Sequence, residues 1–357
     1  MRADRHSEGR GDAEPLPAIS VSAVVVYYRD PAHLAACLDS VCGDQAVSEV
    51  IVVDNASGDG VAEAAAASRQ AVRVVAAERN LGFGGGANLG AVLARGDVLV
   101  FLNPDVVVDP GALDALGGYL ARHDGIAGPV VWQGSSSAAE CGSTVDRMLL
   151  HRGLPAGGPA PLYVTGCCLA MTRRCFDAVG GFEERFFLIN EDVELCWQAL
   201  RRGFDVAVVP NATVRHVGGT AIGGGYRTDR GIETTARRVV LRERSSWGVL
   251  LACVPSRHLA TVAGASLLRA AAFGALFAAH GTWRAAASVW AGPIWGVALS
   301  PGSLARRRRP GVDSGAEAGA WDRVSRMFFA WDLLRRGERL TFVDGRPGRS
   351  RQRRWAA

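Results

Sequence analysis

Lysine is absent from this chain of 357 residues, so all 40 of its basic side chains are arginine. Alanine and glycine are abundant, and we attribute both features to a bias in composition rather than to function. The eight cysteines form no C-x-x-C pair, and several lie inside apolar runs. This spacing disfavours a disulfide framework and a zinc site, and it favours buried thiols in a reducing compartment. The sequence also contains no internal repeat.

A signal peptide is not apparent at the N-terminus, where residues 1–17 are charged and rich in glycine and proline. We therefore expect a disordered leader over these residues. The net charge of +5 is unevenly distributed, because from residue 301 to the end 14 arginines stand against six acids. An arginine-rich tail over residues 306–357 is thus expected to favour anionic surfaces.

Apolar runs alternate with helical patterns through the first third of the chain. Strands are predicted over residues 20–28, 47–54, 72–76 and 98–102, and helices over residues 31–41, 60–70 and 110–123. Residues 80–88 are predicted to form a glycine-rich turn that leads into a helix through Arg95. Such alternation at short spacing predicts an α/β fold with a mostly parallel, doubly wound sheet.

The pattern changes after residue 125. Strands are predicted over residues 126–132, 163–172 and 206–210, a helix over residues 191–202, and a loosely ordered insertion over residues 134–158. Residues 236–305 are predicted to form a helical extension that leans toward a membrane. Within it, residues 285–305 carry no charge, but Pro293 and several glycines weaken this segment as a membrane span. Its tryptophans beside scattered arginines suit interfacial helices, and an ordinary helical subdomain fits equally well.

Two predicted strands end in an aspartate followed by turn-forming residues. Asp105 follows strand 98–102 in an Asn-Pro-Asp turn, and Asp54 ends strand 47–54 just before Asn55. Ligands of open parallel sheets collect at the carboxyl ends of strands, which makes these acids candidates for metal or donor binding. Taken alone, each aspartate fits ordinary turn chemistry better.

The glycine-rich segment 80–88 contains G-x-G-x-x-A, a loose dinucleotide fingerprint. Its backbone N–H groups are candidates for cradling phosphates at the start of a helix. The fingerprint normally follows the first strand of the sheet, where this chain has Arg29, Asp30 and Pro31 instead. An oxidoreductase that uses the loop 82–88 is therefore an alternative that the placement argues against.

Glu191, Asp192 and Glu194 begin a predicted helix, where acids favourably face the helix dipole. The apolar residues before them also favour a second interpretation, because desolvation raises the proton affinity of a carboxylate, as a general base requires. His216 follows a short strand in a predicted loop beside two glycines. A lone histidine in such a place is more often a packing residue than a ligand.

Taken together and in this order, the motifs resemble the family 2 glycosyltransferases, which are inverting enzymes of the GT-A fold. The resemblance covers about residues 20–220 and rests on the segments VIVVDNASGDG, NLGFGGGANLG, NPDV and EDVELC. These sequence segments are most similar to the corresponding segments of bacterial rhamnosyltransferases. The resemblance implies one GT-A catalytic domain over residues 18–235, followed by the helical extension and the tail.

This resemblance also implies a role for each candidate residue. The residues that would bind the donor are Asp54, Asn55, Gly82, Phe83, Gly84, Asn88 and Asn103. Asp105 stands in the place of the metal-binding D-x-D motif and would hold Mg²⁺ or Mn²⁺, with His216 completing the site. Asp192 would be the catalytic base, and Glu191 would orient the acceptor.

The activity that follows is a metal-dependent, inverting transfer of a sugar from a nucleotide-diphospho-sugar. The resemblance favours L-rhamnose, with dTDP-rhamnose as donor and a polyprenyl-linked or cell-surface glycan as acceptor. We expect a cytoplasmic enzyme at the inner face of the plasma membrane, with peripheral membrane contact and no nucleic-acid partner. A non-catalytic sugar-nucleotide-binding homologue is a second alternative, and the joint presence of Asp105, Asp192 and His216 argues against it.

Overall fold

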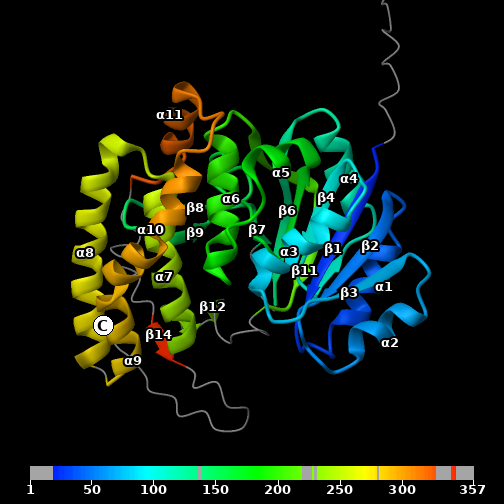
Figure 1. Ribbon diagram of the computed structural model, residues 1–357, viewed down its shortest axis with the longest axis horizontal. Coiled ribbons are helices and arrows are strands. Elements are labelled where there is room, and N and C mark those ends of the chain that lie inside the picture. Colours follow the sequence, from blue (N-terminus) through cyan, green and yellow to red (C-terminus); the bar gives the residue numbers. More distant parts are fainter. Residues whose placement is uncertain are drawn as a thin grey trace, which may run out of the picture.

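The structure, a computed structural model, contains two regions side by side: a central sheet flanked by helices, and a group of C-terminal helices (Figure 1). It describes residues 19–134, 139–218, 227–228, 231–279, 281–326 and 339–342. The leader expected over residues 1–17 lies outside the described residues, as does most of the tail beyond residue 326.

A nine-stranded sheet has the order β3-β2-β1-β4-β10-β6-β11-β5, with β7 paired to β6. The strands are β1 (Val21–Tyr27), β2 (Val47–Asp54), β3 (Val72–Ala76), β4 (Val98–Leu102), β5 (Val106–Val108), β6 (Gly125–Gln133), β7 (Ala139–Glu140), β10 (Cys168–Thr172) and β11 (Asp205–His216). The strands β3, β2, β1 and β4 are parallel, and β10 runs antiparallel between β4 and β6. β11 is parallel to β6, whereas β5 is antiparallel to β11. The sheet is thus mixed and mostly parallel, as predicted.

Alternate residues of the central strands face two separate cores. On one side, Val21, Ala23 and Val25 of β1 pack with helices α1 (Leu34–Cys42), α2 (Val61–Ala67) and α4 (Ala112–Leu120). On the other side, Val24 and Val26 pack with helices α3 (Gly82–Leu93), α5 (Arg173–Val179) and α6 (Glu191–Leu200). Because both faces are buried, the central strands consist mainly of apolar residues. The prediction of a doubly wound sheet is confirmed.

The glycine-rich segment is a helix from Gly82 onward, so the predicted turn through residue 88 is wrong. Its glycines lie where the helix closely approaches side chains of other segments or, at Gly82, the backbone of Phe187. A Cβ at Gly90 would come 2.3 Å from Val24 Cγ1, and one at Gly82 would come 2.0 Å from the Phe187 carbonyl oxygen. Gly82 also has a φ of +75°, which favours glycine. The glycines therefore allow close packing, and the binding of a phosphate by the N–H groups at the start of this helix stays a prediction.

Two further predictions need correction. β11 runs for 12 residues and is bulged between Val209 and Thr213, so His216 ends a strand and does not lie in a loop. The tertiary pairing with β6 extends this strand past Pro210, where the sequence alone predicted its end. The predicted insertion 134–158 contains, besides β7, the short hairpin of β8 (Ser143–Val145) and β9 (His151–Gly153).

The C-terminal region consists of α7 (Ala236–Cys253), α8 (Ser256–Ala279), α9 (Trp283–Trp290), α10 (Gly292–Arg307) and α11 (Ser314–Asp322). A small sheet joins β12 (Arg227–Thr228), β13 (Gly231–Thr234) and β14 (Arg339–Phe342), and the 3-10 helix η1 (Glu184–Phe186) precedes α6. The uncharged segment 285–305 breaks at Ala291 between two helices. Among the described residues, α8 alone is long and apolar enough to cross a membrane by length and composition.

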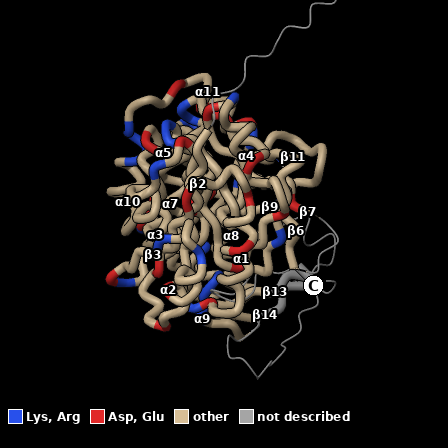
Figure 2. The backbone as a smooth tube through the Cα atoms, turned by 90° about the vertical axis from the view of Figure 1, so that its right-hand side faces the viewer, with Lys and Arg blue, Asp and Glu red and all other residues tan. Residues whose placement is uncertain are grey.

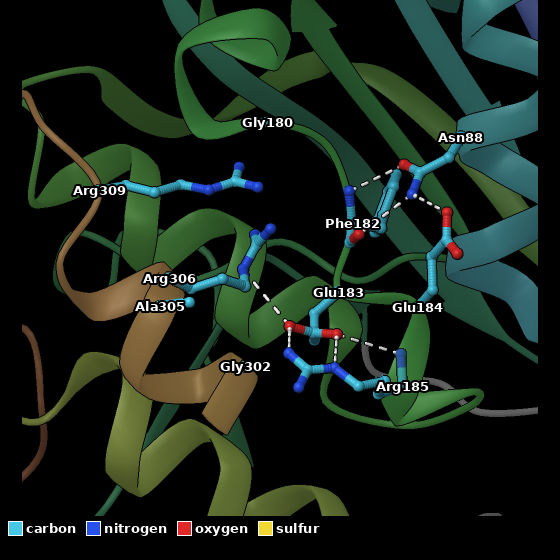
Figure 3. Close-up of a pocket in the computed structure, with 10 residues that line it drawn as sticks. All are labelled: Asn88, Gly180, Phe182, Glu183, Glu184, Arg185, Gly302, Ala305, Arg306 and Arg309. Atoms are coloured by element: carbon cyan, nitrogen blue, oxygen red, sulfur yellow. Dashed lines mark hydrogen bonds and ion pairs between the residues drawn. The ribbon is translucent and has the colours of Figure 1, made fainter. Parts of the chain in front are cut away.

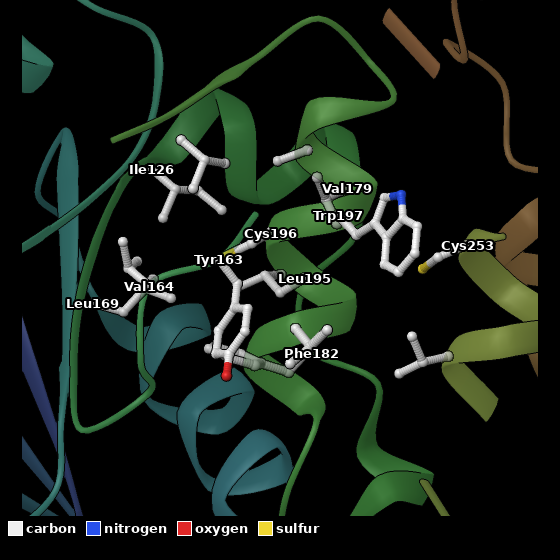
Figure 4. Close-up of a cluster of buried hydrophobic side chains, with 14 of the residues drawn as sticks. Ile126, Tyr163, Val164, Leu169, Val179, Phe182, Leu195, Cys196, Trp197 and Cys253 are labelled. Carbon is white, nitrogen blue, oxygen red and sulfur yellow. The ribbon is translucent and has the colours of Figure 1, made fainter. Parts of the chain in front are cut away.

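Packing and buried charge join the two regions. Trp197 of α6 points toward Cys253 of α7 within the shared core (Figure 4). Arg306 of α10 is 5% exposed and forms a bidentate ion pair with the fully buried Glu194 of α6, with both N–O distances at 2.7 Å. Arg309 donates to the Val179 carbonyl at 2.6 Å.

The arginine run 306–309 begins the tail that was expected to favour anionic surfaces. Instead, Arg306 and Arg309 bind α6 and α5 of the sheet region, and Arg307 donates to the Leu251 carbonyl. Arginines and acids are interspersed along the described chain (Figure 2). Within its described part, this run therefore attaches α10 to the rest of the protein.

Candidate active site

Three predicted site residues meet where β4 and β11 end. His216 Nε2 lies 3.3 Å from Asp105 Oδ1 and 3.5 Å from Asn103 Nδ2. Asp105 is buried, and its Oδ2 accepts a hydrogen bond from the Gly218 backbone N–H at 3.1 Å. The sheet thereby fixes a carboxylate and an imidazole side by side.

These two side chains fit part of a divalent-cation site. Two adjacent ligand atoms that each bind one octahedral ion at about 2.1 Å are about 3 Å apart, close to the separation of Asp105 and His216. The Nδ1 atom of His216 is buried and has no hydrogen-bond partner among the described residues. No cluster of three or more His, Cys, Asp or Glu side chains in the described ranges is arranged to hold an ion. Oxygen atoms from elsewhere, such as a substrate, would have to complete the coordination.

The protonation of His216 is coupled to its neighbours. Burial disfavours the charged imidazolium, but Cys167 and the Asp105 carboxylate outweigh this effect and raise the pKa of His216 to about 10. In this state His216 is protonated at neutral pH. A metal ion that binds there must therefore displace a proton.

Asp192 and Glu191 lie at the start of α6, after Asn190, whose φ of +72° turns the chain into the helix. Asp192 is half-buried, and its carboxylate accepts from the Gly166 N–H at 2.9 Å and the Val193 N–H at 2.8 Å. Burial raises the pKa of Asp192, while these backbone donors oppose the shift. Glu191 is more deeply buried, and burial together with Asp192 raises its pKa as well.

The backbone at Gly166 and Cys167 connects the two groups of side chains. Gly166 donates to Asp192, and the carbonyl of the next residue accepts from the Asn103 N–H at 2.9 Å. Two consecutive residues thus bind the base candidate on one side and the Asn-Pro-Asp turn on the other. The backbone of Gly166 and Cys167 thus links Asp192 to the turn that carries Asp105 beside His216, and the chemical roles of these residues stay predictions.

Sequence reasoning missed Glu140 and Tyr163. Burial raises the pKa of Glu140, Asp192 raises it further and His216 lowers it, so this carboxyl lies within electrostatic range of both halves of the site. It comes from β7 in the Ser- and Gly-rich insertion, which carries no periodicity that would have indicated it. Tyr163 is 7% exposed, and its hydroxyl forms a hydrogen bond with His151 Nδ1 at 2.9 Å.

Two of the predicted donor-binding residues, Asp54 and Asn55, form hydrogen bonds within the fold. Asp54 Oδ1 accepts from the Ser57 N–H at 2.9 Å and caps its own turn. Asn55 accepts from the Leu81 N–H at 2.8 Å and donates to the Gly82 carbonyl at 2.9 Å, which ties the end of β2 to the start of α3.

The ring of Phe83 belongs to the core. It is 6% exposed and packs edge to face on Phe182, with the ring centroids 5.8 Å apart. A Cβ at Gly84 would touch Phe182 Cβ at 3.0 Å, so this glycine also serves packing. Both residues thus pack against Phe182, and their predicted role in donor binding stays a prediction.

Asn88 lines a different cavity, of about 340 Å³, between α3, residues 180–185 and α10 (Figure 3). Its amide accepts from the Phe182 N–H at 2.9 Å and donates to the Phe182 carbonyl at 3.1 Å. The cavity is lined by Asn88, Gly180, Phe182, Glu183, Glu184, Arg185, Gly302, Ala305, Arg306 and Arg309, none of which belongs to the Asp105–Asp192 site. Asn88 therefore joins two segments of the fold, and its role in donor binding stays a prediction.

Comparison with known proteins identifies the family of the chain. Residues 17–238, more than half of the chain, match the sequence family described as glycosyltransferase like family 2. The chain is a family 2 glycosyltransferase. It transfers a sugar from a nucleotide sugar, and this assignment overturns the oxidoreductase alternative.

Curated relatives of this glycosyltransferase include an N-acetylglucosaminyl-diphospho-decaprenol L-rhamnosyltransferase of Mycobacterium tuberculosis. The two are 29% identical over 229 residues, which is 54% of this chain and 74% of the relative. The polypeptide N-acetylgalactosaminyltransferase 15 of Mus musculus is 29% identical over 196 residues, which is 48% of this chain and 31% of that protein.

Solved structures show the same fold. GalNAc-T7 with UDP, GalNAc and Mn²⁺ has a TM-score of 0.55 at 17% identity; the match covers 68% of this glycosyltransferase and about half, 49%, of that chain. Staphylococcus aureus TarS 1–349 in complex with UDP has a TM-score of 0.52 at 13% identity, covering 90% of this chain and 92% of that one. At these identities the likeness concerns the fold, which is GT-A-like, as predicted.

Proposed function

We propose that this glycosyltransferase transfers L-rhamnose from dTDP-rhamnose to a polyprenyl-diphosphate-linked saccharide, with inversion at the anomeric carbon. The observation that carries the proposal is the meeting of the Asp105–His216 pair with the half-buried Asp192 across Gly166 and Cys167. The mycobacterial relative supports the choice of sugar and acceptor.

In this proposal the two halves of the site divide the chemistry. Asp105 and His216 would hold Mg²⁺ or Mn²⁺, whose charge stabilises the leaving diphosphate when it is bound. Asp192 accepts the proton of an acceptor hydroxyl while the oxygen of that hydroxyl forms a bond to the anomeric carbon. The bond from that carbon to the donor phosphate oxygen breaks, and the nucleoside diphosphate leaves with the electron pair. Glu191, whose raised pKa favours a protonated carboxyl, orients the acceptor by donating a hydrogen bond.

We also propose that helices α8 to α10 rest on the inner face of the plasma membrane. Eight of the twelve exposed large apolar side chains in the described part of the chain lie on these helices: Leu267, Leu268, Leu276, Trp283, Trp290, Ile294, Trp295 and Val297. The exposed Trp283 beside the exposed Arg284 suits a membrane interface. A protein held there would meet a lipid-linked acceptor directly.

A panel of nucleotide sugars tests the reaction. The purified full chain is incubated with dTDP-rhamnose, UDP-GlcNAc or GDP-mannose, with Mn²⁺ or with EDTA, and nucleoside diphosphate release is measured with and without a prenyl-diphosphate-linked N-acetylglucosamine. We expect release from dTDP-rhamnose that requires Mn²⁺ and is greatly stimulated by the acceptor. Release that is independent of metal, or a clear preference for another sugar nucleotide, would contradict the proposal.

A further inference from the structure

The chain just before Asp192 has an unusual backbone. Phe187, Ile189 and Asn190 have φ values of +67°, +70° and +72°, whereas only three other non-glycine residues in the described part of the chain have a positive φ. A positive φ is unfavourable for L-residues, most of all for a β-branched side chain such as that of Ile189. Such a segment keeps this conformation only where contacts with the rest of the protein hold it. Residues 187–190 therefore depend on partners outside the segment.

The start of α3 holds one end of this segment. The Phe83 N–H donates to the Phe187 carbonyl at 2.9 Å. The same carbonyl oxygen leaves no room for a Cβ at Gly82, so the segment fits against α3 only because residue 82 is glycine. This contact fixes Phe187, at the end of the segment that is farther along the chain from Asp192.

Helix α7, which lies beside α6, holds the other end (Figure 1). The buried side-chain amide of Asn190 donates to Ser245 Oγ at 2.9 Å and to Ser246 Oγ at 3.2 Å. One turn further along α7, Gly248 packs so closely on the Phe186 ring that a Cβ would collide with it. The residue that begins α6 is thus bound to a helix of the C-terminal region.

The hydroxyl groups of the two serines are oriented to accept these hydrogen bonds. Ser245 Oγ donates to the Leu241 carbonyl at 2.9 Å, and Ser246 Oγ donates to the Arg242 carbonyl at 2.7 Å. Because each hydroxyl hydrogen points back along α7, the oxygen lone pairs are left to accept from Asn190. The Arg242 carbonyl also accepts from this amide, at 3.4 Å. These contacts therefore require a hydrogen-bond donor at residue 190.

Asn190 controls where the Asp192 carboxylate lies, because it begins the helix that carries it. Its carbonyl accepts the first hydrogen bond of α6, from the Glu194 N–H at 3.0 Å. Asp192 follows two positions later, and its carboxylate accepts from the Gly166 N–H at 2.9 Å. A rotation of the chain at Asn190 would therefore move the Asp192 carboxylate away from Gly166.

We propose that Asn190, Ser245 and Ser246 are positioning residues that hold Asp192 in place for proton transfer. This inference rests on the proposed function, because it takes Asp192 as the base. A base must lie within hydrogen-bond reach of the proton that it accepts, and a displacement of about 1 Å can lower the rate about 100-fold. Both serines lie beyond residue 238, where the family match ends, so the C-terminal helices contribute to the acceptor side of the site.

Hydrogen exchange at the Gly166 amide tests the position of Asp192 without requiring turnover. The full-length wild type is compared with Asn190→Gly, which permits the positive φ but removes the side-chain amide, and with the double variant Ser245→Ala/Ser246→Ala. In both variants the Gly166 amide should exchange about tenfold faster or more, toward its rate in Asp192→Ala, which lacks the acceptor. The amides of β1, in the middle of the sheet, should exchange as in the wild type.

Ser266→Ala is the matched control, because Ser266 is a buried serine of α8 whose hydroxyl has no hydrogen-bond partner among the described residues. It should leave exchange at Gly166 unchanged. If the double variant does not fold, Asn190→Gly and Ser245→Ala alone decide the question. Wild-type exchange at Gly166 in these variants would overturn the proposal. An equal increase at Gly166 and in β1 would also overturn it, because the whole fold would then be loosened.

Turnover separates this inference from the proposed function. With dTDP-rhamnose, Mn²⁺ and prenyl-diphosphate-linked N-acetylglucosamine, Asn190→Gly and the double variant should lower kcat by about tenfold or more. Their affinity for dTDP in Mn²⁺, measured by calorimetry, should equal that of the wild type. An unchanged kcat would overturn the positioning role. If the wild type does not turn over these substrates while the exchange result holds, the proposed function fails and the positioning of Asp192 stands.

Discussion

The two sides of the active site are built in different ways. Asp105 and His216 come from the ends of strands, where the pairing of β11 with both β5 and β6 fixes their separation. Asp192 comes from the start of a helix and depends on Gly166 and on the packing of α7 against α6. The family match ends at residue 238, within the first turn of α7. The donor side is thus made from the common sheet, whereas the acceptor side also depends on helices beyond the family region.

The largest effect should come from the acceptor side. Asp192→Asn keeps the size of the side chain but removes the base, so we expect kcat to fall by about 10²–10⁴-fold. Donor affinity, measured by calorimetry with dTDP and Mn²⁺, should stay the same because Asp105 and His216 are untouched. If this variant retained the full kcat, Asp192 would not be the catalytic base, and the contrast drawn between the two sides of the active site would be wrong.

The attachment of the two regions should be the next most sensitive feature. Arg306→Ala leaves Glu194, two residues after Asp192, buried without its partner and should lower the free energy of unfolding by about 3–5 kcal/mol. Chemical denaturation measures this loss. Arg174→Ala removes the exposed pair with Asp124 and should cost less than about 1 kcal/mol. Similar losses for both variants would show that α10 is not held by the buried pair.

On the donor side, Asp105→Asn should weaken donor binding only when metal is present. We expect the affinity for dTDP in Mn²⁺ to fall by at least about tenfold. Loss of a residue that only supports a metal ligand can already weaken metal binding by about this factor. In EDTA the wild type and the variant should bind dTDP equally. An equal loss in both conditions would mean that Asp105 supports the fold or the nucleotide directly, and not the ion.

The smallest effect is expected in the glycine-rich helix α3, which packs against β1. Gly90→Ala places a methyl group against Val24 and should destabilise the protein by about 1–3 kcal/mol. Gly118→Ala in α4 meets nothing within 4 Å and should stabilise it by about 0.5–1 kcal/mol, because alanine favours a helix. Thermal unfolding compares the two. If Gly90→Ala is also stabilising, close packing does not explain the glycines.

The sequence predicted the donor side of the site better than the acceptor side. Strands β2, β3 and β4 have the predicted bounds because each is rich in apolar residues, despite Ser48 and Glu49 in β2 and Arg73 in β3, and has a clear stop. Residues 82–88 were misjudged because glycine opposes a helix locally, while close contact with β1 favours one in the folded protein. Glu140 carries no local signal, since only the tertiary fold brings it near Asp192.

A crystal structure of the full chain with Mn²⁺ and dTDP tests the central claim most directly. The anomalous signal of manganese should lie about 2.1–2.3 Å from an Asp105 oxygen and a His216 nitrogen, with the terminal phosphate of dTDP on the side of Asp192. A manganese signal elsewhere, for example in the cavity between Asn88 and Arg306, would contradict the shared site that this account describes.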